Sequence, residues 1–468
     1  MAEASNTNAQ MPGTRAATAT RRGIFGWVLY DWAAQPISLL VLTFFFAPFF
    51  TDRFAQDPIS GNATWGYAIA AAGFIVAVAS PILGAIADRT GRRKIWLAGF
   101  SVMLVAGAAG LWAAEPGRAD LMPAIVACVV LLFVGAEFTA VFTNAMLPSL
   151  VAPARIGRVS GVGWSAGYAG GLVALAVFLL FVLPVRADGT TLPGFPALFG
   201  FAAGSGEAER FTGPFAALWY LMFVLPLFFF TPDTPRGSAG GIGQAVVTGL
   251  RELKRTLASV RQNATLVRFL IARMLYVDGL NAIFAFGGIY ATAIFGWSGL
   301  PLALFACVLS VTGLLGALVG GLADDRFGPR AIILTCLVGL LVTAGLALSI
   351  DGQSVLFGAV QVTSADRAAA FTSPAEFAFI AATAGIGLFV GPLQASSRSY
   401  MARLTPPEKA QEYFGFFAFA GRATSFAAPL AIATATVASG SQRIGMAMIA
   451  LFLLAGFALM LTVERAKR

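Results

Sequence analysis

Apolar stretches of about 20 residues recur along the whole chain, and shorter polar segments separate them. As a helix, each stretch is long enough to cross a hydrocarbon layer about 30 Å thick. The stretches do not alternate in the way that short transmembrane β-strands do. The pattern predicts an all-α integral membrane protein with twelve transmembrane helices, at roughly 24–50, 63–87, 95–114, 121–148, 157–184, 212–231, 265–296, 300–323, 331–350, 374–400, 410–437 and 443–463.

Composition agrees with this pattern and argues against a soluble protein. Of the 468 residues, 58% are hydrophobic and 11% are charged, whereas soluble domains carry about 25% charged residues. The chain has no histidine, so any proton carrier must be Asp or Glu. The three cysteines lie in apolar stretches without a CxxC pair, as small buried side chains do.

The formal charge of +9 would suit a polyanion partner, but the distribution of charge argues against nucleic acid. With both termini in the cytoplasm, most of the 31 Lys and Arg residues fall on the cytoplasmic side, and Arg273 and Arg422 fall inside the membrane. This is the positive-inside bias of membrane proteins. High Gly, Ala and Arg with little Asn and Lys suggests a GC-rich bacterium, so we expect a multi-pass protein of the bacterial cytoplasmic (inner) membrane.

The chain divides into four parts. Residues 1–22 form a polar tail that we expect to be disordered and cytoplasmic, and residues 23–231 form a first six-helix half. Residues 232–263 form a basic cytoplasmic linker, and residues 264–468 form a second six-helix half. Within the linker, apolar residues at helical spacing predict an amphipathic helix on the membrane surface. The alternative is a plain connector with a lipid-facing stripe.

A short polar string occurs twice, about half a chain apart. Gly84-x-x-x-Asp88-Arg89-x-Gly91-Arg92-Arg93 follows the second apolar stretch, and Gly321-x-x-x-Asp325-Arg326-x-Gly328-x-Arg330 follows the eighth. Leu29-Tyr30-Asp31 is echoed by Leu275-Tyr276-Val277-Asp278, and Phe133-Val134-Gly135 by Phe389-Val390-Gly391. These echoes in matching order indicate a duplication of six plus six helices.

The repeated string resembles the cytoplasmic loop signature of the major facilitator superfamily of secondary transporters. The resemblance implies a conformational latch made of Gly84, Asp88, Arg89, Gly91, Arg92, Gly321, Asp325 and Arg326. It implies that Asp88 bridges to the other half and holds the inner side shut, while Arg89, Arg92 and Arg93 stay in the headgroup region. Pro329 replaces the first Arg of the pair in the second copy, which predicts a weaker latch there. The alternative is that these arginines only anchor the topology.

Further strings resemble one branch of the superfamily, the vacuole-effluxer-like family related to autophagy-associated amino-acid effluxers. They are Trp27-x-x-Tyr30-Asp31-Trp32, Gly157-Arg158-Val159-Ser160-Gly161, Ala272-Arg273-x-x-Tyr276-x-Asp278-Gly279, Gln394-Ala395-x-Ser397-Arg398-Ser399 and Gly421-Arg422-Ala423-Thr424-Ser425-Phe426. The chain departs from the family pattern at Ala33-Ala34-Gln35-Pro36 and at Val277. The resemblance implies an amino-acid-like cargo, and these departures lie beside expected pocket residues.

Charged residues inside the predicted spans are the candidate site. An Asp, Lys or Arg at the centre of a membrane helix costs ~2.5–3.5 kcal/mol on insertion scales, so such residues face a cavity or a partner. Helical spacing groups Asp31 with Gln35, Glu137 with Asn144, Asp278 with Asn281, and Gln394 with Arg398. The expected substrate or proton pathway comprises Tyr30, Asp31, Trp32, Gln35, Glu137, Asn144, Tyr276, Asp278, Asn281, Gln394, Arg398 and Arg422.

Two interpretations of these charges remain open. They line a cavity around the cargo, or they form structural ion pairs between helices, a role for which Arg273 is the first candidate. Burial raises the pKa of a carboxyl group while a nearby Arg lowers it, so Glu137 is the first candidate proton carrier and Asp31 the second. Arg422 is a candidate for holding a substrate carboxylate through two hydrogen bonds. By resemblance, spans 1, 4, 7 and 10 line the cavity.

We therefore expect a secondary transporter that moves a small polar or zwitterionic solute by alternating access, and not an enzyme. Its expected partners are the solute, the lipid bilayer and protons, and we expect a monomer without cofactor, metal or nucleic acid. One alternative is a membrane-embedded enzyme for a lipid-linked substrate, with Asp324-Asp325 as the nearest candidate cluster. Another is a non-transporting receptor on the same bundle. No Walker loop is present, and Gly161-x-Gly163-x-x-x-Gly167 misses the dinucleotide fingerprint.

Overall fold

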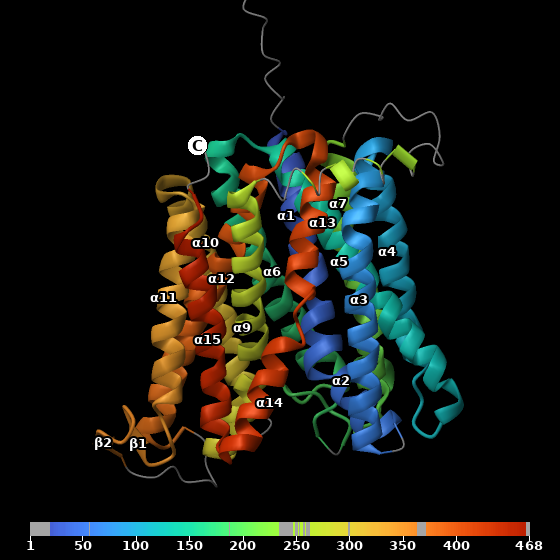
Figure 1. Ribbon diagram of the computed structural model, residues 1–468. Helices are drawn as coiled ribbons and strands as arrows, with labels where there is room; N and C mark the ends of the chain where they lie inside the picture. The colour runs from blue at the N-terminus through green and yellow to red at the C-terminus, as the bar shows by residue number, and fades with distance from the viewer. Residues whose placement is uncertain are drawn as a thin grey trace, which may run out of the picture.

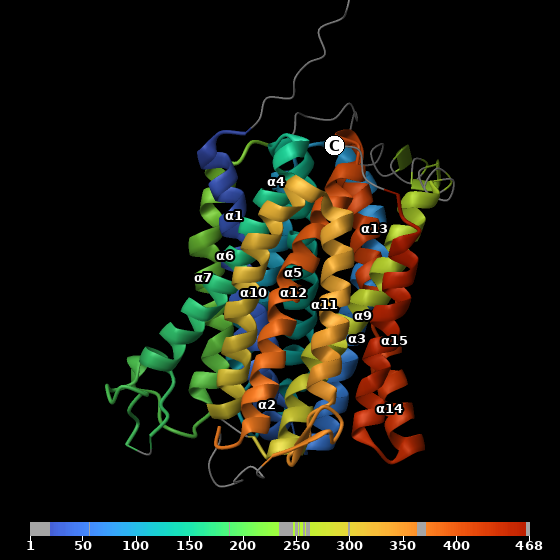
Figure 2. The same ribbon diagram turned by 90° about the vertical axis from the view of Figure 1, so that its left-hand side faces the viewer.

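The computed structural model describes residues 19–464, except for 56, 187, 234–246, 249–250, 252, 256–257, 259–262, 298–299 and 363–370. Twelve helical segments in this part of the chain are long and apolar enough to cross a membrane, which confirms the predicted number and order of spans. They run side by side in one bundle (Figure 1). We call the end where α1 begins and α15 ends the terminal face, which is at the top of Figures 1 and 2. The other end is the opposite face.

The first half contains spans 1 to 6. Its α-helices are α1 (Arg21–Pro36), α2 (Phe46–Phe49), α3 (Pro58–Thr90), α4 (Arg93–Gly110), α5 (Met122–Leu150), α6 (Ile156–Val177) and α7 (Glu207–Phe230). Short 3₁₀ or π turns extend several of them, at Leu111–Ala113, Ala119–Leu121, Pro153–Arg155, Phe178–Val182 and Leu198–Gly200. Exposed apolar side chains such as Phe74, Val102 and Leu218 lie on the outside of the bundle, as a lipid-facing surface requires.

The second half contains spans 7 to 12. Its helices are α9 (Ala264–Phe295), α10 (Leu300–Phe327), α11 (Pro329–Leu348), α12 (Pro374–Leu404), α13 (Ala410–Arg422), α14 (Ala427–Ser439) and α15 (Gln442–Leu461). A 3₁₀ turn at Pro407–Lys409 precedes α13. Strands β1 (Ser354–Val355) and β2 (Val360–Gln361) pair antiparallel, with Ser354 opposite Gln361, in the loop between α11 and α12. This hairpin lies at the opposite face (Figure 1).

The segment boundaries differ from the predicted ones at the ends of the first half. α1 begins at Arg21, inside the predicted tail, because the Thr20 hydroxyl accepts the backbone N–H of Gly23 and caps the helix. Residues 1–18 lie outside the described residues. The linker, with its predicted amphipathic helix, also lies largely outside them, so this prediction stays open.

Span 1 does not continue as a regular α-helix after α1. It changes to a π-helical stretch at Ile37–Phe44, and a second one at Phe50–Phe54 follows α2. Pro36 has no N–H to donate to the carbonyl of Trp32 four residues earlier. That carbonyl instead accepts the Nε1–H of Trp219 in α7 at 3.3 Å. The proline therefore ends the regular helix, and a neighbouring span satisfies the carbonyl that it leaves free.

Span 11 is also interrupted. α13 ends at Arg422 and α14 begins at Ala427, and the four residues between them form turns. Interrupted helices in membrane proteins are tolerated where they are buried in protein or line a cavity. The break lies midway along the span, at the depth where the sequence predicts the site.

The two halves pack against each other through α3 with α13 and through α6 with α10. These are span 2 with span 11 and span 5 with span 8, so the two contacts are related by the duplication. Glycine permits the close approach: a Cβ on Gly84 in α3 would lie 2.5 Å from the carbonyl oxygen of Gln411 in α13. Figure 2 shows the same bundle turned by 90°, with α6 beside α10.

Gly107→Val tests the helix packing inside the first half. A Cβ at Gly107 in α4 would lie 2.5 Å from the backbone nitrogen of Leu132 in α5, and overpacking of this kind costs about 1–3 kcal/mol. We expect a lower thermal unfolding temperature of the purified protein. Gly99→Val in the same helix is the matched control, because nothing lies within 4 Å of a Cβ there. Equal unfolding temperatures of the two variants would contradict this packing.

Candidate functional site

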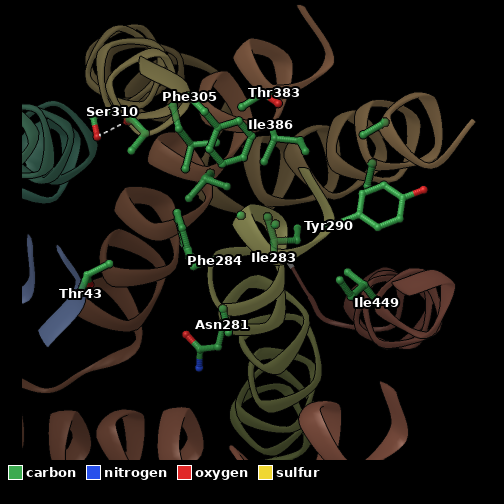
Figure 3. A pocket seen from close by; sticks show the side chains of 18 of the residues that line it. Thr43, Asn281, Ile283, Phe284, Tyr290, Phe305, Ser310, Thr383, Ile386 and Ile449 are labelled. Atoms are coloured by element: carbon green, nitrogen blue, oxygen red, sulfur yellow. Dashed lines mark hydrogen bonds between the residues drawn. The ribbon is translucent and has the colours of Figure 1, made fainter. Parts of the chain in front are cut away.

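A cavity of about 810 Å³ lies between the two halves. Its lining residues come from span 1 and from α6, α9, α10, α11, α12, α13 and α15. Thr43 after α1, Tyr290 near the end of α9 and Phe305 near the start of α10 all belong to the parts of their spans nearer the opposite face (Figure 3). The cavity therefore extends from the middle of the bundle toward the opposite face.

Four residues predicted from the sequence line the cavity: Gln35, Asn281, Gln394 and Arg422. They form a polar part of the lining, and most of the other lining residues are apolar or aromatic. Figure 3 shows Asn281 projecting from α9, apart from the group of Ile283, Phe284, Phe305 and Ile386. Arg422 is the only charged residue of the lining that the structure describes.

Arg422 forms an ion pair with Glu137 across the two halves. Its Nη2–H donates to Oε1 of Glu137, and its Nε–H donates to Oε2 at 3.4 Å. The side chains keep 28% and 26% of their surface exposed, so the pair is open to the cavity. The guanidinium carbon also lies 4.9 Å from the ring centroid of Phe133, a cation–π distance. The pair thus joins α5 to the end of α13 at the cavity.

Arg398 forms a second cluster across the halves, on the terminal side of the cavity. From α12 it donates to Asp31 Oδ2 at 2.9 Å, to Asn144 Oδ1 at 3.1 Å, and to the hydroxyl and carbonyl of Ser160 at 2.9 and 2.7 Å. It lies 4.8 Å from the ring of Trp27 and is buried. One guanidinium therefore binds three helices of the first half, α1, α5 and α6.

The predicted aromatic residues lie inside their own halves. The Tyr30 hydroxyl is hydrogen-bonded to Thr139 at 2.9 Å, and the Tyr276 hydroxyl to Ser397 at 2.7 Å. These are matching contacts, from span 1 to span 4 and from span 7 to span 10. Trp32 stacks on Trp219 with ring centroids 6.2 Å apart. These three residues do not line the cavity.

Asp278 has a different environment from the other predicted carboxylates. It is 1% exposed, and neither of its oxygens has a hydrogen-bond partner among the described residues. Arg273, one turn earlier in α9, instead donates to the carbonyl of Phe417 at 2.7 Å and lies 3.5 Å above the ring of that residue. Arg273 therefore makes helix-to-helix contacts.

The first latch is a helix cap that crosses the halves. Asp88, at the end of α3, accepts the backbone N–H groups of Gln411 at 3.2 Å and Glu412 at 2.9 Å, both in the first turn of α13. A carboxylate at this position satisfies N–H groups that the helix leaves unpaired and opposes the positive end of the helix dipole. The bridge that the resemblance implies for Asp88 is present in this form.

The second latch repeats this arrangement in the other direction. Asp325, near the end of α10, accepts the backbone N–H of Gly157 at 2.9 Å in the first turn of α6. Arg403 lies 3.4 Å from Asp325 and 2.9 Å from Asp324, and Arg158 lies 3.8 Å from Asp325. In this copy the repeated string has Pro329 in place of an arginine. Arginines from outside the string surround the latch instead. Gly321 of α10 packs against the backbone of Gly157 and Gly161 in α6.

One prediction for the first latch is wrong. Arg93 does not stay in the headgroup region but is buried, with 4% of its surface exposed. Its guanidinium donates to the carbonyls of Ala145 at 2.9 Å and Pro407 at 3.0 Å, and it lies 3.9 Å from Asp88. Contacts with carbonyls of α5 and of the turn before α13 hold it between the halves. The neighbouring Arg92 has a left-handed backbone (φ 51°) beside Gly91 (φ 63°) and is exposed, as is Arg326.

The described cavity also differs from the expectation that spans 1, 4, 7 and 10 line it. Spans 1, 7 and 10 contribute, but α5 of span 4 contributes none of its lining residues and reaches it only through the Glu137 pair. Sequence reasoning missed Trp164 and Tyr168 of α6, which do line it. Their spacing of four residues within a glycine-rich helix is the signal that could have found them.

The latches and the Arg398 cluster join the halves at the terminal face, while the cavity lies toward the opposite face. A twelve-helix bundle of two related halves, shut at one end around a central cavity, is the architecture of a transporter that works by alternating access. A solved structure titled as the proton:xylose symporter XylE, of the major facilitator superfamily, superposes with a TM-score of 0.67 and 13% identity, covering 95% of each chain. The protein thus has the major facilitator fold.

The sequence comparisons identify the branch. The family described as "Vacuole effluxer Atg22 like" matches residues 53–468, and the chain belongs to this family of membrane transporters. It is 27% identical over 440 residues to the uncharacterized MFS-type transporter YxiO of Bacillus subtilis, covering 92% of each chain. It is 24% identical over 326 residues to autophagy-related protein 22-1 of Penicillium rubens, covering 66% of this chain and 50% of that protein.

Removing the latch carboxylates tests whether they hold the terminal face shut. Ala395, between the halves, is 1% exposed. With Cys128, Cys307 and Cys336 replaced, a cysteine introduced by Ala395→Cys reports on access from the terminal face. We expect Asp88→Ala or Asp325→Ala to raise its alkylation rate roughly 5–30-fold, because a lost cap costs about 1–2 kcal/mol.

Asp57→Ala is the matched control for this experiment. Asp57 caps α3 by accepting the backbone N–H groups of Ile59 and Ser60, at the opposite face and within the first half. Its loss removes a helix cap of the same type without touching the contact between the halves. Equal alkylation rates in all three variants would mean that the carboxylates do not latch the terminal face.

Proposed function

We propose that the protein carries a small zwitterionic or carboxylate-bearing solute by alternating access around the polar end of the cavity. The observation that carries this proposal is the position of Arg422, which faces the cavity where span 11 is interrupted. A guanidinium binds a carboxylate through two parallel hydrogen bonds. Gln35, Asn281 and Gln394 supply amide groups from three other spans around it.

The remaining wall favours a solute with an apolar part. Leu39, Phe284, Phe305 and Ile386 are typical of the lining, and Thr383 and Ser310 use their hydroxyls on carbonyls of their own helices. A carboxylate at one end of the cargo and hydrocarbon at the other would match this distribution. The resemblance described in the sequence analysis implies an amino-acid-like cargo, and the description of the family as vacuole effluxers supports efflux.

The distribution of charge supports an orientation in the membrane, and the family description supports export. The terminal face carries the latch strings with Arg89, Arg92 and Arg326, and the positive-inside rule favours the cytoplasm for such a face. Both termini are then cytoplasmic, and the state described here faces outward. We propose an exporter in the inner membrane of a bacterium, acting as a monomer.

Proton coupling is a second part of the proposal, with Glu137 as the carrier. In this state Arg422 donates two hydrogen bonds to Glu137. A cargo carboxylate that takes over Arg422 leaves Glu137 without its cationic partner, which favours uptake of a proton. Asp31, the second candidate from the sequence, is engaged by Arg398. Binding of the cargo would in this way be linked to binding of a proton.

The alternative of a membrane-embedded enzyme has no cluster to support it. Asp324 and Asp325 hold Arg403 and cap α6, and no group of three or more metal-ligating side chains occurs among the described residues. A non-transporting receptor remains the other alternative, and a flux measurement with the purified protein in vesicles distinguishes it.

Arg422→Gln tests the anchor for the carboxylate. We expect amino acids to raise the unfolding temperature of the wild-type protein in a thermal-shift screen. Hydrogen bonds to charged groups are worth about 1.5–3 kcal/mol, so affinity for the best ligand should fall at least about tenfold in the variant. Arg118→Gln, whose arginine pairs with Asp120 in an exposed loop, should bind as the wild type does. Equal affinities in both variants would exclude Arg422 as the anchor.

Glu137→Gln tests the proton coupling. In proteoliposomes, wild-type flux of the solute found in that screen should change severalfold when a pH gradient is imposed. The variant keeps the size of the side chain but cannot exchange a proton, so its flux should ignore the gradient. Asp120→Asn, at an exposed carboxylate, should respond as the wild type does. Wild-type flux that ignores the gradient would remove proton coupling from the proposal.

A further inference from the structure

Asp278 is a buried carboxyl group that the contacts described so far leave unused. It is 1% exposed in the middle of α9, and both oxygens lack a hydrogen-bond partner among the described residues. Every other membrane carboxylate of the predicted pathway has a cation: Asp31 has Arg398 and Glu137 has Arg422. A carboxylate ion buried without a partner is strongly unfavourable, and the group neutralises instead.

The charged and titratable groups near α9 are engaged elsewhere. α9 packs against α12, α13, α14 and α15. On these helices and on α9 itself these groups are Arg268, Arg273, Tyr276, Tyr290, Glu376, Arg398, Tyr400, Arg403, Glu412, Tyr413, Arg422 and Arg443. None of them forms an ion pair or hydrogen bond with Asp278 in the described structure. No cation is therefore available to hold the ionised form.

Among the described residues, the hydroxyl of Thr424 faces Asp278. This hydroxyl is buried and also lacks a hydrogen-bond partner. Thr424 belongs to the turn between α13 and α14, two residues after Arg422. Asp278 is thus next to the interruption of span 11, and Asn281, one helical turn further along α9, lines the cavity.

From this geometry we infer that Asp278 is a proton-binding site that is loaded in the outward-facing state. The carboxylate gains a proton from a hydronium ion that enters from the cavity; an O–H bond forms on one oxygen and water leaves. The neutral acid can then donate a hydrogen bond to the Thr424 hydroxyl, or accept one from it, with small movements. The proton is stored at the turn that joins the two pieces of span 11.

This site is separate from Glu137, which pairs with Arg422 in the same state. Movement of the turn at Thr424 changes the surroundings of Asp278 and of Arg422 together, because only Ala423 separates Thr424 from Arg422. Release of the proton would accompany the closing of the cavity. Its use in transport rests on the proposed function, whereas protonation of Asp278 does not.

The experiment is an infrared spectrum of the purified protein in lipid nanodiscs at neutral pH. An unionised carboxylic acid has a C=O stretching band well separated from the bands of carboxylates, and the band moves in D₂O. We expect this band in the wild type and a loss equivalent to one carboxyl group in Asp278→Asn. Asp120→Asn, at an exposed carboxylate, should leave the band unchanged.

A second variant keeps the test valid if Asp278→Asn does not fold. Thr424→Val removes only the facing hydroxyl, and it should shift the frequency of the band without removing it. Identical spectra of the wild type and both variants would overturn the assignment. A band that disappears from the wild type when sodium chloride replaces choline chloride would also overturn it, because Asp278 would then bind a metal cation.

The same preparations separate this inference from the proposed function. If the band is lost in Asp278→Asn while wild-type flux ignores a pH gradient, the proton site stands and proton-coupled transport fails. If the flux follows the gradient and the band is the same in all variants, coupling stands without Asp278, and the inference fails.

Discussion

The closed end of this bundle depends on carboxylates that bind helix N-termini of the other half. The first residues of α6 and α13 are buried between the halves, where water does not satisfy the first N–H groups of a helix, so a side chain must do so. Asp88 does this for α13, and Asp325 does it for α6. Neither half satisfies these two helix ends alone. The rest of the structure is arranged around the requirement that the halves meet at this face.

Three layers of polar contact follow from that requirement along the axis of the bundle. The helix caps lie nearest the terminal face, the Arg398 cluster comes next, and the pair of Glu137 with Arg422 lies at the cavity. In each layer a group from one half meets a group from the other. The burial of these contacts falls toward the cavity, where the last pair is partly exposed. Cargo in the cavity therefore meets an inter-half ion pair that is partly exposed.

The sequence was sufficient for the fold because membrane insertion imposes simple rules on length, hydrophobicity and charge. Twelve spans and two related halves follow from apolar stretches and from the repeated string around Asp88 and Asp325. The interruptions of spans 1 and 11 were harder to predict. Pro36 is visible in the sequence, but the compensation of its free carbonyl by Trp219 depends on tertiary packing.

Side-chain partners were the part of the candidate site that the sequence could not supply. Spacing brings Gln394 and Arg398 to one helix face, yet Gln394 lines the cavity and Arg398 reaches into the first half. Asp31 and Asp278 occupy echoing positions in the two halves, but only Asp31 meets a cation. Partners of this kind depend on which helices of opposite halves face each other, which a single sequence does not contain.

The π-helical stretch after Pro36 has a consequence for the shape of the cavity. Ser38, Leu39, Leu42 and Thr43 all lie in this stretch and line the cavity. In π geometry each hydrogen bond spans five residues instead of four. A return to α geometry would turn everything beyond Pro36 about the helix axis and carry these side chains away from the cavity. The π geometry of span 1 thus determines which of its side chains face the cavity.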